Sequence, residues 1–168
     1  MLDVDKKLRE ARYFLRNMKA REALAFGDHE EFDFCLSAFL SAGRSLDYRL
    51  RHMSKRYAPF RVAWDKTLNA DELEFIKFMI DDRNVEVHET GSTRQQAEVR
   101  VPVRGRYSDP SGTLTVLSGV PGTPPAEFIK PTYYFSIAGK QLTVLAACDT
   151  YIRLLERLVA DCRASGIA

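Results

Sequence analysis

The chain has 168 residues, enough for a single domain with a substantial core. Its hydrophobic fraction of 45% and charged fraction of 29% are ordinary for a soluble globular protein, and its net charge of +2 is too small to argue for nucleic acid by itself. No apolar run approaches the roughly 20 residues of a membrane span, and the charged segment Met1–Lys6 does not resemble a signal peptide.

Two long helices are predicted in the first third of the chain. The first runs from about Asp5 to Phe26 and ends at Gly27, and the second begins after Asp28, a suitable N-cap. The apolar residues of the second helix recur at alternating steps of four and three: Phe32, Leu36, Phe39, Gly43, Leu46, Leu50 and Met53. Such a sustained stripe predicts packing in a bundle of helices.

The next helix contains a break in its apolar pattern. Pro59 interrupts the chain, a short helical piece holds Trp64 and Leu68, and a longer helix starts near Asn69. Its stripe reads Leu73, Ile76, Ile80, Arg83 and Val87. Arg83 therefore stands where an apolar residue is expected, and a buried charge needs a partner, a ligand or a second subunit. Such breaks concentrate at functional sites.

A segment of different amino-acid composition follows, from about residue 94 to 140. Six of the seven prolines lie between Pro102 and Pro131. A strand is predicted where valines alternate with other residues, at Val99, Val101 and Val103. It is placed at a sheet edge because Pro102 has no backbone N–H to donate. Further strands are predicted over 114–117 and 132–137, with a Gly/Pro loop over 118–131 between them.

The last helix is predicted from about Gln141 to Ser165, with an apolar stripe that is wide enough to pack on more than one side. The fold class is therefore mainly α within α+β, with a small antiparallel β insert between the arginine-bearing helix and the C-terminal helix. We expect residues 1–168 to form one domain that includes the insert over 94–140, because the insert is too short for a core of its own.

The segment Arg83-Asn84-Val85-Glu86-Val87-His88 carries the clearest chemistry. Arginine binds phosphate through a planar fork of donors, and histidine moves protons near neutral pH. The two positions lie about 140° apart on a regular helix, so either the helix ends near Val85 or two chains assemble the site. The alternative is a structural Arg83 paired with an acid, and an exposed His88.

This segment resembles the Arg-x4–6-His motif of the HEPN family (higher eukaryote and prokaryote nucleotide-binding), in which a polar residue commonly follows the arginine, as Asn84 does here. Residues 34–45 also resemble the long second helix of prokaryotic members. The resemblance covers the helical two-thirds of the chain and implies a HEPN-like bundle of long helices. The β insert departs from the plain bundle and leaves the subgroup open.

The resemblance implies a metal-independent endoribonuclease that acts as a homodimer, often as a toxin with an antitoxin partner or in antiviral defence. In that case His88 serves as general base or acid, Arg83 neutralises the transition state and Asn84 orients His88 or a phosphate oxygen. The product is a 2′,3′-cyclic phosphate. Because some members of the family are inactive, the alternative is a non-catalytic module that binds a nucleotide, RNA or a protein. A third possibility is a helical scaffold that recruits another protein through its edge strand or Pro-rich loop.

A second group of candidate residues is basic. Arg44 is a candidate phosphate contact that can also pair with Asp47 at i,i+3. The segment from Tyr48 to Trp64 has basic residues interleaved with Tyr48, Tyr57, Phe60 and Trp64, and its candidate RNA contacts are Arg49, Arg51, Lys55 and Arg56. The alternative is a solvated helix end that carries favourable cations.

No other chemistry is indicated. The sequence has no zinc-ligand cluster, no Gly-rich phosphate loop and no nucleophile triad, so no metal and no cofactor is expected. Three cysteines without metal-ligand spacing predict reduced core thiols in a cytoplasmic protein.

Overall fold

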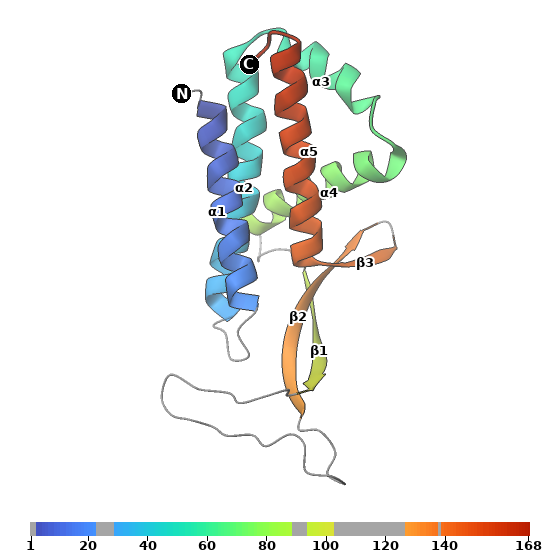
Figure 1. Ribbon diagram of the computed structural model, residues 1–168. Helices are drawn as coiled ribbons and strands as arrows, with labels where there is room; N and C mark the ends of the chain where they lie inside the picture. Colours follow the sequence, from blue (N-terminus) through green and yellow to red (C-terminus); the bar gives the residue numbers. More distant parts are fainter. Residues whose placement is uncertain (1–2, 23–28, 89–93, 103–126, 138) are drawn as a thin grey trace. The chain divides into compact units, whose positions relative to one another are not determined.

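The computed structural model describes residues 3–22, 29–88, 94–102, 127–137 and 139–168 (Figure 1). The helices are α1 (Asp3–Glu22), α2 (His29–Met53), α3 (Tyr57–Asp65), α4 (Ala70–His88) and α5 (Val144–Ala164), and the strands are β1 (Gln95–Pro102), β2 (Glu127–Ile137) and β3 (Lys140–Thr143). The protein is mainly helical with a small antiparallel sheet, as predicted.

The chain divides into two compact units. One combines residues 1–95 with 133–168 and holds the five helices of the described residues, and the other spans residues 96–132. The smaller unit lies inside the segment predicted as an insert. That the whole chain forms one domain stays a prediction.

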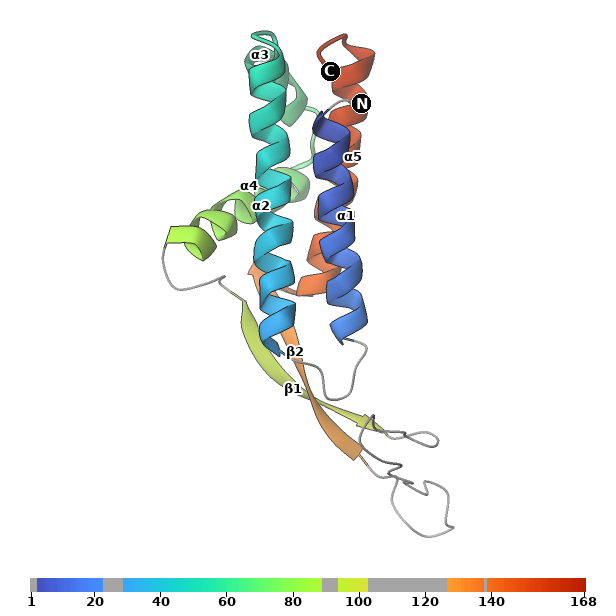
Figure 2. The same ribbon diagram turned by 90° about the vertical axis from the view of Figure 1, so that its left-hand side faces the viewer.

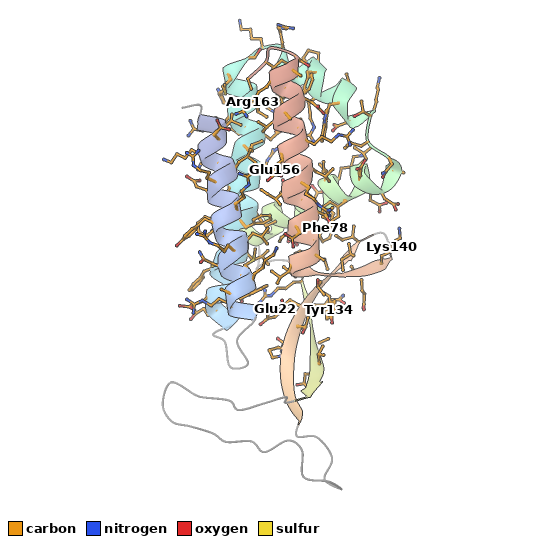
Figure 3. The ribbon with its side chains drawn as sticks, in the orientation of Figure 1. Glu22, Phe78, Tyr134, Lys140, Glu156 and Arg163 are labelled. Carbon is orange, nitrogen blue, oxygen red and sulfur yellow. The ribbon has the colours of Figure 1, made fainter. Side chains whose placement is uncertain are left out.

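The larger unit is a bundle in which α1, α2 and α5 lie side by side (Figures 1 and 2). Helix α4 packs against α2 and α5, and α3 contacts the same two helices. Among the described residues, three ion pairs join α1 to α5: Arg12 with Glu156 at 2.7 Å, Lys19 with Asp149 at 2.7 Å and Arg163 with Asp5 at 2.5 Å. Glu156 and Arg163 are labelled in Figure 3. None of the described helices is long and apolar enough to cross a membrane.

The predicted stripes of α2 and α5 form the core of this bundle. On α2, Met53 is the exception, since it is 40% exposed at the helix end, where the chain turns away toward α3. Contrary to the prediction, Pro59 does not interrupt helical structure, because it lies in the first turn of α3. A proline is tolerated there, since the N–H that it lacks would have no partner within the helix. Trp64 lies in α3 as predicted, while Leu68 follows the helix.

The sheet has the strand order β1-β2-β3, which places β1 at an edge as Pro102 predicted. Strands β2 and β3 form a hairpin in which Tyr134 faces Thr143 and Ile137 faces Lys140, and Gly139 turns the chain with a φ of 72°. The prediction that residues 118–131 are loop is wrong at its end, because β2 begins at Glu127. The strand predicted over 114–117 lies outside the described residues.

The start of the last helix was predicted three residues too early. Residues 141–143 belong to β3, and α5 begins at Val144. The side chain of Thr143 accepts a hydrogen bond from the Ala146 backbone N–H at 3.2 Å and so forms the N-cap. A strand and a capping threonine together explain why the helix cannot extend further toward the N-terminus.

Candidate functional site

The helix that carries the Arg-x4-His segment has a well-defined start. The Asn69 side-chain oxygen accepts from the Glu72 backbone N–H at 2.8 Å, and the Glu72 carboxylate accepts from the Asn69 backbone N–H at 3.0 Å. This reciprocal pair is a capping box, and it satisfies two N–H groups that have no partner within the helix. Helix α4 then continues for 19 residues to His88, its last residue.

The predicted catalytic residues therefore share one continuous helix. Of the two predicted alternatives, the one in which the helix ends near Val85 is wrong, because α4 includes all of residues 83–88. Positions 83 and 88 of a regular helix lie about 140° apart around its axis. The side chains of Arg83, Asn84 and His88 lie outside the described residues, so their roles stay predictions.

The buried side of α4 differs from the predicted stripe. Among residues 70–82, whose side chains are described, the buried residues are Phe75, Ile76, Met79 and Asp82, while Leu73 and Ile80 are only partly buried. Within residues 70–82 the buried side of α4 thus includes one charged residue, Asp82, which is 2% exposed. Sequence reasoning missed it, although steps of three from Ile76 lead through position 79 to position 82.

The negative charge of Asp82 affects the pKa of a cysteine on α5. The pKa of the Cys148 thiol is raised, first by burial and then by the negative charges of Asp149 and Asp82. Cys148 is therefore a protonated core thiol, as predicted, and not a nucleophile. All three cysteines are free.

A second polar cluster surrounds Asp47 of α2, which is 5% exposed. One carboxylate oxygen accepts from the Tyr57 hydroxyl at 2.6 Å and from Arg61 Nη1 at 3.0 Å. The other accepts from Arg44 Nη1 and Arg51 Nε, each at 3.2 Å. The predicted pairing of Arg44 with Asp47 is confirmed, and two of the predicted phosphate contacts are thereby bonded to a buried acid of their own chain.

The electrostatics of this cluster fix its protonation. Burial raises the pKa of Tyr57, and the charge of Asp47 raises it further, so the hydroxyl remains a donor. Burial acts to lower the pKa of Arg61, but its hydrogen bonds to Asp65, at 2.8 Å, and to Tyr57 outweigh this and raise it. Three guanidinium groups thus share two carboxylates, which leaves the junction of α2 and α3 cationic.

The aromatic residues interleaved with these cations are divided between core and surface. Tyr57 and Trp64 are 0% and 3% exposed, so their rings cannot stack on RNA bases. The Trp64 indole N–H donates to Asp161 at 2.9 Å, and the Arg61 and Arg157 guanidiniums lie 5.2 and 5.9 Å from its ring centre. This part of the predicted RNA-binding pattern is wrong. In an amphipathic helix, residues three or four positions apart face the core, and Tyr57 and Trp64 occupy such positions.

The remaining basic candidates lie at the corner between α2 and α3. Arg49, Lys55 and Arg56 are exposed there, beside Tyr48, which is 58% exposed. Arg56 also donates to the backbone oxygen of Ser165 at 3.5 Å. Figure 2 places this corner at one end of α2, whereas α4 passes its middle, so one chain does not bring these cations to the Arg83–His88 segment.

A hollow of about 550 Å³ lies at the opposite end of α4 from His88. Its apolar lining comes from Phe75, Ile137 and Leu142, and the Lys140–Asp71 ion pair of 2.9 Å lies on its rim. Among the described residues, no group of three or more His, Cys, Asp and Glu is arranged to hold a metal ion.

Comparison with known proteins found no match among protein-family models, curated proteins or solved structures.

Proposed function

We propose that the chain is a metal-independent endoribonuclease of HEPN type. The observation that carries the proposal is the Arg83-x4-His88 segment in the last turns of a bundled helix, α4. The segment supplies the two groups that this reaction requires, a phosphate-binding cation and a proton-transfer group near neutral pH.

The chemistry follows from these groups and the RNA itself. His88 accepts the proton of a ribose 2′-hydroxyl, the 2′-oxygen attacks the adjacent phosphorus, and the bond from phosphorus to the leaving 5′-oxygen breaks. Arg83 neutralises the charge that accumulates on the phosphoryl oxygens, and Asn84 orients His88 or one of these oxygens. A proton delivered to the leaving oxygen completes the step, and the products are a 2′,3′-cyclic phosphate and a 5′-hydroxyl.

A second copy of the chain completes the site in this proposal. Because α4 is continuous to His88, positions 83 and 88 of one copy diverge by about 140°. A two-fold axis beside the end of α4 would bring Arg83 of one copy to His88 of the other. The divergence of the two positions on one helix supports the proposal of a homodimer with two composite sites.

The exposed cations at the corner of α2 and α3 support RNA as the substrate. Arg49, Lys55 and Arg56 supply a sequence-independent attraction for phosphates. We place the protein in the cytoplasm, in keeping with its free cysteines, as a toxin or defence component that an antitoxin or another protein restrains.

The test is cleavage of RNA in excess EDTA. The wild-type chain should cut single-stranded RNA and leave cyclic phosphate ends. His88→Ala should abolish cutting with an unchanged circular dichroism spectrum, whereas His29→Ala, which removes the histidine that begins α2, should remain active. Equal loss in both variants, or cleavage that EDTA abolishes, would refute the proposal.

The exposed cations also favour a second candidate, a module that binds RNA without cutting it. In that case binding weakens steeply with salt, and no cyclic ends appear under any condition. A chain that neither cuts nor binds RNA refutes both candidates and favours a scaffold that recruits another protein.

A further inference from the structure

Helix α2 presents one face that no described helix or strand covers. In Figure 2 this helix stands beside α1, with α3 behind its upper end and α4 crossing at its middle. Phe34 is 62% exposed and Tyr48 is 58% exposed on this face, although both are large and apolar. Between them Ser37, Ser41 and Ser45 follow at helical spacing, each partly buried.

The face is self-complementary about its centre. Phe34 and Tyr48 stand at equal distances in sequence on either side of Ser41, and so do Glu30 and His52. When two such helices pack antiparallel with Ser41 opposite Ser41, Phe34 of each copy meets Tyr48 of the other. Glu30 then meets His52 at the outer ends of the same contact.

The charges along α2 favour the same orientation. Its first turn carries Glu30 and Glu31, and its last turn carries Arg51 and His52. An antiparallel pair places each acidic end against a basic end, whereas a parallel pair would oppose like charges. Inside the chain Glu31 pairs with Arg21 and Arg51 pairs with Asp47, yet the basic end keeps an excess of guanidinium over carboxylate.

The side chains in the middle of the face permit a close approach. Ser37, Ser41 and Ser45 are small, so two helix axes can come within about 8 to 10 Å of each other. The aromatic rings at either end would then bury the apolar area that Phe34 and Tyr48 leave exposed.

We infer that the outer face of α2 is the surface on which a second copy of this chain docks, antiparallel, about a two-fold axis at Ser41. The nuclease proposal requires two copies with a two-fold axis beside the end of α4, and the inference goes beyond it by naming the helix face through which the copies meet. It depends only on α2 and is tested by association rather than by cleavage.

The first test is the mass of the full chain in solution at roughly 50 µM, by light scattering after size-exclusion chromatography. The wild type should have twice the chain mass of 19.1 kDa. Phe34→Glu and Tyr48→Glu should each raise the dimer dissociation constant roughly thirtyfold or more, since each buries a carboxylate against a ring. The control Tyr13→Glu, on α1 and 52% exposed, should remain dimeric.

The second test fixes orientation and register. Ser41→Cys should form a disulfide-linked dimer on mild oxidation, because the two-fold axis passes beside this position, and Tyr13→Cys should not. Glu30→Lys and His52→Glu should each weaken the dimer, and the double variant should recover it through the reversed pair.

Several outcomes would overturn the inference. A wild-type monomer at this concentration would do so, as would a dimer that persists in both glutamate variants without Ser41→Cys cross-linking. A chain that stays monomeric while Phe34→Glu weakens RNA binding would assign the face to RNA. Loss of cleavage in His88→Ala at unchanged mass tests the nuclease separately, so the two proposals can fail independently.

Discussion

Replacing Asp47 by asparagine tests whether the polar cluster at the α2–α3 junction stabilises the fold. Asparagine keeps the shape of the side chain but removes its charge and turns one acceptor into a donor. Tyr57 Oη and Arg61 Nη1 can still bond the remaining oxygen, while Arg44 and Arg51 now face an N–H group.

The expected loss in the free energy of unfolding follows from how exposed each arginine partner of Asp47 is. Arg44 and Arg51 have side chains 37% and 58% exposed, so water replaces their bonds at a cost of about 0 to 1 kcal/mol each. The Arg61 side chain is only 13% exposed, and loss of the partner of a buried charge costs about 3 to 5 kcal/mol. Because Arg61 keeps its bond to Asp65, we expect a net loss of about 2 to 4 kcal/mol in the free energy of unfolding.

Urea denaturation followed by circular dichroism measures this free energy. Arg51→Gln is the matched control, since it removes an exposed partner of the same carboxylate and should cost less than about 1 kcal/mol. The reasoning is refuted when Asp47→Asn lies within about 0.5 kcal/mol of the wild type, or when the control costs as much as Asp47→Asn.

Three further predictions concern packing, pH and RNA. Gly43→Ala should destabilise the fold by about 1 to 3 kcal/mol despite the better helix propensity of alanine, because its Cβ would lie 2.6 Å from Cε1 of the buried Tyr151; a rise in the melting temperature would contradict this. Burial raises the pKa of Cys162 to about 11 from its ordinary value of 9.0, so its protonated form stabilises the fold fully below pH 9. That contribution, up to about 3 kcal/mol, should be lost between pH 9 and 11, and a flat stability over this range would refute it. Replacing three exposed cations by glutamine should lower the slope of log binding constant against log salt for single-stranded RNA by about 2, and an unchanged slope would remove them from the RNA contact. The three are Arg49, Lys55 and Arg56.

The helical part of the fold was largely predictable because its signal is periodic. Stripes at steps of three and four located α2, α4 and α5, and Asn69 marked the start of α4. Pro102 predicted an edge strand because a residue without a backbone N–H cannot donate the hydrogen bond that a central strand requires. Local patterns of this kind depend on the backbone period and on single-residue geometry, both of which the sequence contains.

The polar interior was harder to predict. Arg44 with Asp47 was visible as an i,i+3 pair, but Tyr57 and Arg61 reach the same carboxylate from α3, after a turn whose path the sequence does not specify. Asp82 was missed because the stripe of α4 admits two registers that share Ile76. Only the packing partners of α4, here α2 and α5, decide which register is buried.

The proposed nuclease site takes its arginine and its histidine from different copies of the chain. Arg83→Ala and His88→Ala proteins, each inactive alone, should be unfolded together, refolded as a mixture at equal concentration and assayed for RNA cleavage in EDTA. Half of the dimers would then be mixed and would hold one intact composite site, so the mixture should regain roughly a quarter of the wild-type rate. A mixture as inactive as its two components, with mixed dimers present, would contradict the account.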